Sequence, residues 1–451
     1  MRAPRVLAAI LWVWLGASAA RADDEELLRR IEVLEERVRE LAAEAEERDS
    51  PGPQATLRTG EPSDQDWTRR VRLSGSANTG YYWGQEDSVF SDRRFQIWDA
   101  RLFVDAELGR ELHLGDAPLA RNAGLTFEWN LVRLGQLDND VGELFAEVQG
   151  LLGSDWANLR AGRFQIPVGQ AYESYGRGYP AKPFISHPVG APWWWDEGLA
   201  LYGGDPEGRF GYVASVTDGE TPFGADFDDD KQVTLKLVAE PLPWLEVTLS
   251  GLRSGGLGSQ FVPALGALWL GESFAQAFGS GTDVPNTIDG AEVADGPNRL
   301  HDSYLGSVDL ISRLPDWGQL WLAYGAYHID STGADVYDRT LHYWIAEVLV
   351  EAGRLSPLLD PFYLGFRASG LGTYDRDRGY LLDWRYGETL GYNMRSVDAF
   401  SSVLGWRLSR WLTLRTEYTH QRFELVRGVD PALRKASDDA DFAGIEVGAS
   451  F

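Results

Sequence analysis

Ionisable side chains recur at every second residue in several short segments of this chain, with apolar residues between them. The basic members of this pattern are Arg101, Arg160, Lys236, Arg367 and Arg415. The acidic members are Asp99, Asp105, Glu107, Glu128, Glu143, Glu147, Glu246, Asp309, Glu347, Glu417 and Glu446. Charged groups gathered around one aqueous passage select ions, and arginine or lysine at close quarters holds anions such as phosphate. Ion pairing between neighbouring strands is the alternative role for each of these residues.

Catalytic and metal chemistry is poorly supported by the residue pattern. The six histidines are dispersed along the chain, at His113, His187, His301, His328, His342 and His420, and none lies in a nucleophile motif or has metal-ligand spacing. Zero cysteines exclude disulfides and thiolate chemistry. We therefore predict a protein without enzymatic activity, cofactor or metal. An outer-membrane barrel enzyme is the alternative class, and it would require a nucleophile, a base and an orienting group in one place.

The elements that carry the alternating charges are strands with one apolar face. Trp98, Ala100, Leu102, Val104, Ala106 and Leu108 form one apolar row, and the charged residues between them form the other. A charge that faces lipid costs roughly 2–4 kcal/mol for arginine or lysine at the bilayer midplane. The apolar rows should therefore face lipid, and the charged rows should face a single water-filled interior. A transporter of lipids or fatty acids should instead have an apolar inner row.

About sixteen such segments follow one another from residue 69 to residue 451. They lie near 69–84, 95–108, 123–134, 142–150, 157–165, 197–203, 209–218, 231–239, 245–253, 301–313, 319–330, 342–352, 362–373, 395–408, 411–425 and 441–451. The last one alternates apolar and small or polar residues and ends in the aromatic Phe451, as the closing strand of an outer-membrane barrel does. The sequence therefore predicts an all-β, 16-stranded antiparallel transmembrane β-barrel over 69–451.

The connections between these strands alternate in length. Tight connections lie at Gly204–Gly208, Glu240–Trp244, Leu314–Gly318 and Ser409–Arg410, and long ones at Ile166–Asp196, Ser254–Leu300, Tyr374–Met394 and Val426–Ala440. Bacterial barrels have short periplasmic turns and long extracellular loops. Both termini of the barrel should therefore lie on the periplasmic side.

The segments before the barrel have a different character. Residues 1–22 combine a basic start, a short apolar run and an A-x-A site, which predicts a secretory signal peptide rather than a membrane helix. Residues 23–49 carry an a/d seam, at Leu27, Ile31, Leu34, Val38, Leu41 and Ala45, which predicts a periplasmic coiled-coil helix. A single amphipathic helix on the barrel rim is the alternative. Residues 50–68 are rich in proline, glycine and polar residues and form a predicted linker.

Charge and composition narrow the range of partners. The chain has 42 Lys and Arg against 68 Asp and Glu. Removal of Arg2, Arg5 and Arg21 with the signal peptide leaves 39 against 68, a net charge of −29. Nucleic acid is therefore excluded as an expected partner. Eighteen tryptophans suit the aromatic girdles that meet outer-membrane lipid.

Two segments resemble the phosphate-selective porin O and P family. Leu159–Gly169 (LRAGRFQIPVG) is similar to that family's entry into a pore-constricting third loop, and Trp194–Gly203 (WWDEGLALYG) is similar to the return strand. The resemblance implies a homotrimeric channel in the outer membrane of a Gram-negative bacterium, often with arginines along the path of an anion. The chain departs from that pattern because its predicted lumen residues are mostly acidic and only four lysines occur in it.

The connection Ile166–Asp196 is therefore predicted to fold into the lumen and to narrow it. Prolines keep it from pairing as a strand, at Pro167, Pro180, Pro183, Pro188 and Pro192. Arg177 and Lys182 on this loop, with Arg160 and Arg163 at its base, should stand near the constriction and favour anions. Alternatively Glu173, Asp196 and the acidic wall neutralise these bases, which leaves a general pore with a weak preference for cations.

Overall fold

The computed structural model describes the barrel part of the chain. The described residues are 70–84, 94–114, 117–133, 136–175, 182–192, 195–219, 231–258, 268–269, 274–275, 287–288, 291–292, 300–314, 317–331, 339–373, 394–425 and 439–451. The predicted signal peptide (1–22), coiled-coil helix (23–49) and linker (50–68) lie outside them. Among the described residues, helices of the length and apolarity needed to cross a membrane do not occur.

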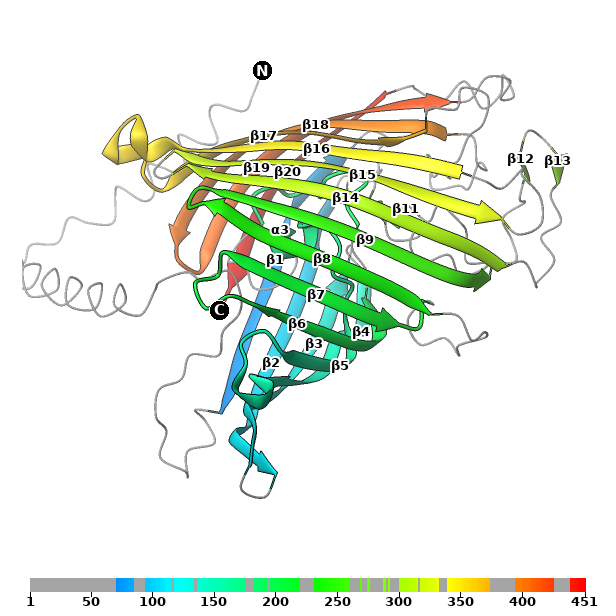
Figure 1. Cartoon of the computed structure of the whole chain (residues 1–451). Helices are drawn as coiled ribbons and strands as arrows, with labels where there is room; N and C mark the ends of the chain where they lie inside the picture. The colour runs from blue at the N-terminus through cyan, green and yellow to red at the C-terminus, as the bar shows by residue number, and fades with distance from the viewer. Residues whose placement is uncertain are drawn as a thin grey trace, which may run out of the picture. The chain divides into compact units, whose positions relative to one another are not determined.

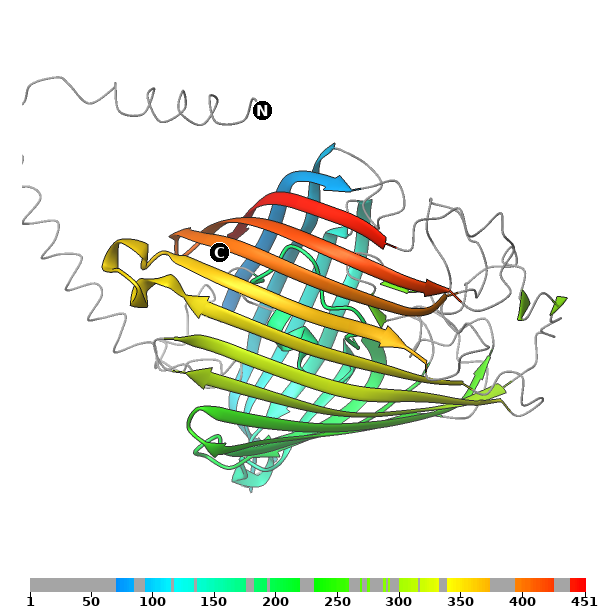
Figure 2. The same cartoon turned by 90° about the horizontal axis from the view of Figure 1, so that it is seen from above.

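Sixteen antiparallel strands close into one barrel, as predicted (Figures 1 and 2). They are β1 (Val71–Gly84), β2 (Arg94–Leu114), β3 (Ala117–Arg133), β4 (Gln136–Gln149), β5 (Asn158–Gln165), β6 (Trp195–Gly204), β7 (Phe210–Thr217), β8 (Gln232–Leu242), β9 (Leu245–Gly258), β14 (Leu300–Leu314), β15 (Gly318–Ser331), β16 (Arg339–Glu351), β17 (Phe362–Gly372), β18 (Met394–Ser409), β19 (Leu412–Leu425) and β20 (Asp439–Ser450). Each strand pairs with its neighbour in sequence, and β1 pairs with β20. The sheet therefore closes on itself.

The minor elements lie in the connections. They are the short helix α3 (Ala171–Tyr175), the 3-10 turns η2 (Leu151–Gly153), η4 (Ala352–Arg354) and η5 (Pro357–Leu359), and the two small hairpins β10 (Leu268–Trp269) with β11 (Phe274–Ala275) and β12 (Thr287–Ile288) with β13 (Ala291–Glu292). The hairpins interrupt the connection between β9 and β14, which the sequence predicted as one long loop.

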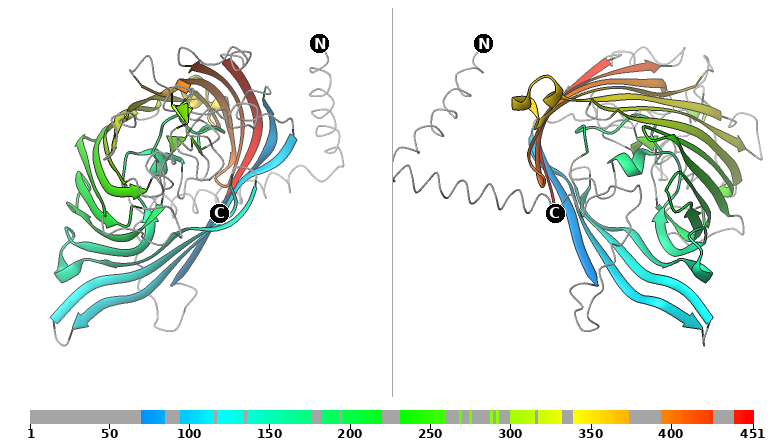
Figure 3. Two further views of the ribbon diagram at one scale, coloured as in Figure 1. Left: turned by 90° about the vertical axis from the view of Figure 1, so that its right-hand side faces the viewer. Right: turned by 60° about the vertical axis from the view of Figure 1, so that its left-hand side comes forward.

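The two ends of the barrel differ in the length of their connections, and both barrel termini lie at the short-turn end, as predicted. Two details differ from the sequence prediction. The β3–β4 connection at the long-loop end has only two residues, because pairing continues to Arg133 and Gln136. At the opposite end β2 and β3 continue beyond their neighbours as a projecting hairpin (Figure 3). Pro118 is tolerated there because the outer side of this hairpin is unpaired.

Alternation separates a lumen face from a lipid face along every strand. The buried acidic residues Glu347, Glu417 and Glu446 lie on inward rows, whereas large apolar side chains are exposed on outward rows. The most exposed tryptophans lie near the short-turn end, at Trp156, Trp244, Trp317, Trp406 and Trp411. Of the exposed tyrosines in the described strands, Tyr81 and Tyr304 lie nearer the long-loop end, whereas Tyr324 and Tyr418 lie near the middle of β15 and β19. The lipid-facing surface therefore has two chemically different borders.

One residue of the predicted lipid-facing row lies on the other face. The register of β1 with β2 shifts between Asn78 and Thr79, so that Asn78 is opposite Asp99 and Thr79 is opposite Ile97. Trp98 is the extra residue of this bulge and is buried in a cluster with Tyr82, Ile185 and Phe442. The prediction that Trp98 faces lipid with Ala100 was therefore wrong, because a bulge re-aims a side chain that strict alternation would place outside.

The barrel closes at the C-terminal residue. The backbone amide of Phe451 donates to the carbonyl of Gly75, and the amide of Gly75 donates to the carbonyl of Phe451, both at 3.0 Å. A Cβ atom at Gly75 would lie 2.8 Å from the Phe451 ring and 2.8 Å from the carbonyl oxygen of Arg101. The absence of a side chain at Gly75 therefore leaves room for the Phe451 ring beside β1.

We predict that Gly75→Leu destabilises the closed barrel by about 1–3 kcal/mol, because overpacking at this contact has no room to relax. Ala77→Leu is the matched control, since Ala77 is exposed on the same outward row of β1. Heat-dependent mobility in detergent gels measures the unfolding midpoint of each variant. Equal midpoints for the two variants would contradict the role assigned to Gly75.

Candidate functional site

The described parts of the connection between β5 and β6, residues 166–175 and 182–192, lie in the interior of the barrel, and we call them the inward loop. Seen along the barrel, α3 and the adjoining segments lie inside the ring of strands (Figure 3). Ile166, Val168, Phe184, Ile185 and Val189 are each at most 2% exposed. A connection that ran over the surface would expose such side chains. The prediction that this loop enters the lumen is confirmed.

The first part of the inward loop is fixed to β9. The backbone amide of Gly169 donates to Ser250 Oγ at 3.1 Å. Gln170 Nε2 donates to Glu246 Oε1 and to Thr248 Oγ1, both at 2.6 Å. Gly169 has φ +62°, a left-handed conformation that glycine adopts without strain. After it leaves β5, the chain therefore crosses the lumen directly and reaches β9 within five residues of Gln165.

Arg367 on β17 joins two separate parts of the loop. Its Nη1 donates to the Tyr175 hydroxyl and to the Ser186 carbonyl oxygen, both at 2.9 Å. The guanidinium carbon lies 4.4 Å from the centre of the Phe184 ring. Glu347 and Glu417 lie 3.7 and 3.8 Å from its nitrogens, and all three charged side chains are at most 2% exposed. Arg367 is thus enclosed in a compensated polar network.

The carboxylate of Glu417 continues this network on β19. It accepts the backbone amides of Ile185 and Ser186 and the hydroxyl of Ser186. Thr419 Oγ1 donates to it at 2.8 Å. Two backbone amides of a loop that has no strand partner are satisfied in this way, which a buried segment requires. The sequence identified Glu417 as a lumen acid but gave no signal of these partners.

Arg415 forms a third attachment, where the loop meets the seam between β1 and β20. Its Nε lies 2.9 Å from Glu446 Oε1, and Nη2 donates to Asn78 Oδ1 at 2.7 Å. Nη1 donates to the carbonyl oxygen of Lys182, while Lys182 Nζ donates to the carbonyl of Ile185. Both basic side chains are buried. Neither is presented to a passing anion, which differs from the role predicted for them.

Two groups on the inward loop have pKa values shifted by its burial. Burial, followed by the nearby Glu347 carboxylate, raises the pKa of Tyr175 well above its usual value. Burial, followed by the charges of Lys182, Arg101, Arg367 and Arg415, lowers the pKa of His187 well below its usual value. Tyr175 therefore stays protonated and His187 stays neutral at physiological pH. The ring of His187 lies against Tyr175, with their centroids 5.6 Å apart.

The opposite wall, formed by β2–β5, carries both partly exposed and buried charges. Arg160 lies 3.4 Å from Glu147, and its side chain is 25% exposed against 12% for Glu147. The Arg160 guanidinium also packs on the rings of Phe145 and Tyr202, at 4.1 and 5.2 Å. Arg101 lies 3.0 Å from Asp99 and 3.7 Å from Glu128. These contacts place Arg101 and Arg160 on the lumen face, as predicted, and pair each with carboxylates.

The remaining predicted site residues are distributed differently. Lys236 lies on the inward row of β8, opposite Ser250, and is buried. Arg163 lies on an outward row, opposite Leu144 and Glu197, and donates to the carbonyls of Val141 and Gly142. The prediction that Arg163 stands at the constriction was therefore wrong: its position relative to Arg160, three residues earlier, places it on the other face. Arg177 lies outside the described residues.

The described histidines do not assemble a catalytic group. His328, His342 and His420 lie on outward rows, where their partners are Thr340, Tyr324 and Asp441. His113 lies in the projecting β2–β3 hairpin. Within the described part of the chain, no group of three or more His, Asp or Glu side chains is placed to hold a metal ion.

Comparisons with known proteins identify the fold. No protein-family model matches the chain, and no curated protein matches it. Among solved structures, the barrel is similar to an anion-selective porin from Comamonas acidovorans, with 11% identity, a TM-score of 0.52, and coverage of 84% of this chain and 99% of the other.

Two further structures are similar to the barrel. The outer membrane channel DcaP of Acinetobacter baumannii has 10% identity, a TM-score of 0.52, and coverage of 84% and 97%. The outer membrane protein OmpT of Vibrio cholerae has 12% identity, a TM-score of 0.51, and coverage of 84% and 97%. At these identities the likeness shows the barrel fold alone.

Proposed function

We propose that this chain is an outer-membrane porin, through which small hydrophilic solutes and ions diffuse passively. The observation that carries the proposal is the division of the lumen into two unequal sides. The inward loop covers the inner face of β16–β20, where Arg367, Arg415, Glu417 and Glu446 are nearly inaccessible. On the β2–β5 side, Arg160 and Glu147, which lie nearer the short-turn end, keep part of their side-chain surface exposed, whereas Arg101, Glu128 and Glu143 are buried. A water-filled path along the part of β2–β5 that holds Arg160 and Glu147 agrees with this distribution.

The lumen chemistry favours a general pore with a weak preference for cations. Four of the described lumen bases, Arg101, Arg160, Arg367 and Arg415, each have one or two carboxylates within 4 Å. Acidic residues outnumber basic ones among the lumen positions identified from the sequence. A channel lined by acids attracts cations. The anion or phosphate preference implied by the family resemblance would depend on bases outside the described residues, such as Arg177.

The same proposal includes the outer membrane as location and a homotrimer as assembly. Large apolar side chains face outward around the barrel, exposed tryptophans lie at its short-turn border, and Tyr81 and Tyr304 lie toward its long-loop border. This surface is suited to a bilayer with aromatic girdles. The short-turn end, which holds both barrel termini, would face the periplasm. In this arrangement the predicted coiled-coil helix (23–49) would follow the signal peptide into the periplasm and support trimer formation. Mass measurement in detergent that finds only monomers, before and after deletion of 23–49, would remove the trimer from the proposal.

Ion selectivity should respond to the pair formed by Arg160 and Glu147. We predict that Arg160→Gln increases the preference for cations and that Glu147→Gln decreases it, because each change removes one charge from the partly exposed wall. Reversal potentials in a gradient of potassium chloride, with and without added phosphate, measure the shift. Glu207→Gln is the control, since Glu207 lies in the short β6–β7 turn with a side chain 67% exposed. Reversal potentials that are the same in all variants would exclude a path along this wall.

The attachment of the inward loop should depend on Arg367. We predict that Arg367→Met weakens loop docking by about 3–5 kcal/mol, because Glu347 and Glu417 lose their buried cation. The single-channel conductance should rise and become noisier as the loop leaves the β17 wall. Arg121→Met is the control, since Arg121 pairs with Asp155, their side chains are 52% and 40% exposed, and such surface pairs contribute about 0–1 kcal/mol.

Gel mobility without heating separates a loop effect from failure to form the barrel. A folded Arg367→Met barrel with unchanged conductance and noise would show that Arg367 does not hold the loop in the conducting path.

A further inference from the structure

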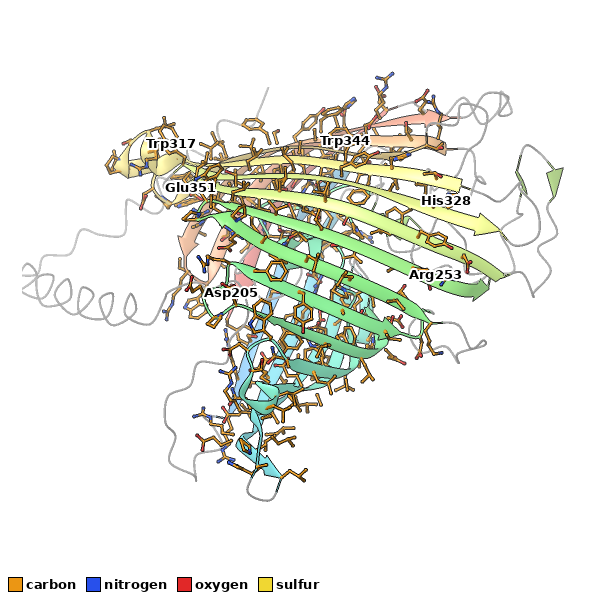
Figure 4. All side chains as sticks on the ribbon, in the orientation of Figure 1. Asp205, Arg253, Trp317, His328, Trp344 and Glu351 are labelled. Carbon is orange, nitrogen blue, oxygen red and sulfur yellow. The ribbon has the colours of Figure 1, made fainter. Side chains whose placement is uncertain are left out.

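A polar row crosses the outer face of the barrel near the long-loop end. Arg253 on β9 is opposite Tyr304 on β14, which is opposite His328 on β15, which is opposite Thr340 on β16. Cross-strand neighbours of this kind lie about 4.5–5.5 Å apart. The Arg253 side chain is 66% exposed, and Tyr304 is 37% exposed. Figure 4 shows Arg253 and His328 near the long-loop ends of their strands.

The next row toward the short-turn end consists of small residues. Gly251 is opposite Gly306, and Gly306 is opposite Ala326. A Cβ atom added at Gly306 would meet nothing within 4 Å, and one at Gly251 would meet only a backbone oxygen at 3.9 Å. We call this area the Gly306 hollow. It is an open recess between the polar row and the apolar residues below it.

Larger side chains border the hollow on its other sides. His342 is opposite Ala326 and closes one end. Leu249, Val308, Tyr324 and Trp344 form the following row across the same strands. The Tyr324 hydroxyl lies 2.8 Å from His342 Nδ1, with the two rings stacked at 6.0 Å. The hollow therefore combines an apolar floor with a polar rim.

The rim presents cationic and imidazole groups outward. His328 Nδ1 lies 3.0 Å from Thr340 Oγ1, and its ring stacks on Tyr304 at 6.3 Å. These contacts fix the ring and leave Nε2 on its opposite edge. The Arg253 guanidinium lies 4.0 Å from the carboxylate of Asp302, at the outer limit of an ion pair. An anion with several oxygens could bind both groups at once.

The height of this row on the barrel corresponds to a membrane border. On β14, Leu314 and Tyr304 are ten residues apart on the same outward row. That separation is about 33 Å along a strand and about 25 Å along the membrane normal at the usual strand tilt. An apolar band of about 25 Å is typical of outer-membrane barrels. Since Leu314 lies at the short-turn border, Tyr304 lies at the opposite headgroup level.

We propose that the Gly306 hollow binds a phosphorylated lipid of the outer leaflet. Arg253 and His328 hold the phosphate, and an acyl chain lies over Gly251, Gly306 and Ala326. A planar guanidinium matches phosphate oxygens in pairs, and the recess accepts a hydrocarbon chain that a flat strand face could not. The inference rests on the outer-membrane location in the proposed function and is independent of solute passage.

Native mass spectrometry of the full-length mature barrel in detergent tests this site, with diphosphorylated lipid A as the probe. We expect the Arg253→Gln/His328→Gln variant to bind the probe at least about tenfold more weakly, which corresponds to the loss of a charge-assisted contact. Gly306→Val should also weaken binding because it fills the hollow and leaves both polar groups in place. Arg209→Gln is the matched control, since Arg209 is likewise 66% exposed but lies at the short-turn end. It should bind as the unchanged protein does.

Further measurements identify the ligand and test whether each variant is still folded. Inorganic phosphate should not displace the lipid, and lipid A stripped of its phosphates should bind weakly to every variant. Displacement by inorganic phosphate would assign the site to a free anion, and strong binding of stripped lipid would reduce it to an apolar recess. Either result, or equal affinity in all variants, overturns the proposal. Unchanged gel mobility and single-channel conductance confirm that each variant is folded, so that failure here and failure of the pore proposal remain distinguishable.

Discussion

Backbone hydrogen bonding in a medium without water is the constraint on which this structure depends. Inside a bilayer each exposed amide or carbonyl costs several kcal/mol, so a sheet that spans the membrane has to close. Here the closure is the pairing of β1 with β20, which the mutual hydrogen bonds of Gly75 and Phe451 complete. Strand number, the alternation of side chains and the two kinds of border all follow from that closed sheet.

Closure creates an interior that side chains alone do not fill, and the inward loop divides it. The loop brings its own unpaired backbone groups into the barrel, and inward residues of β9, β17 and β19 satisfy several of them. Arg367 and Arg415 are central because Arg367 pairs with two buried carboxylates and Arg415 with one, and each donates to a backbone carbonyl of the loop. Removing charges from water is costly, and only a complete set of partners compensates for it. The arginines that are most enclosed therefore hold the loop, and the partly exposed Arg160 is better placed to meet a solute.

The distribution of side chains on the outer surface also follows the medium that each part of it contacts. Tryptophans are exposed near the short turns, while Tyr81, Tyr304, His328 and Arg253 lie toward the long loops. The short-turn border suits an interface between hydrocarbon and lipid headgroups. The indole ring of tryptophan is mostly apolar and carries one hydrogen-bond donor, so that it can contact both. The second border adds cationic and hydrogen-bonding groups, which suit a layer rich in phosphate. The two borders of the barrel therefore differ in their side chains, which distinguishes the short-turn end from the long-loop end.

The sequence by itself determined the strand count, the strand positions and the inward or outward face of most residues, because lipid on one side and water on the other impose a period of two. It also indicated the loop that enters the lumen, since Ile166–Asp196 is long, rich in proline and aromatic. Only the tertiary structure decided which wall the loop covers, because the partners of Tyr175 and Ser186 on β17 lie about 190 residues away. The bulge that turns the Trp98 side chain inward also depends on the register of β1 with β2, which the alternation of residue types does not indicate. The role of each base was decided in the same way, since burial and partners, and not residue type, distinguish Arg415 from Arg160.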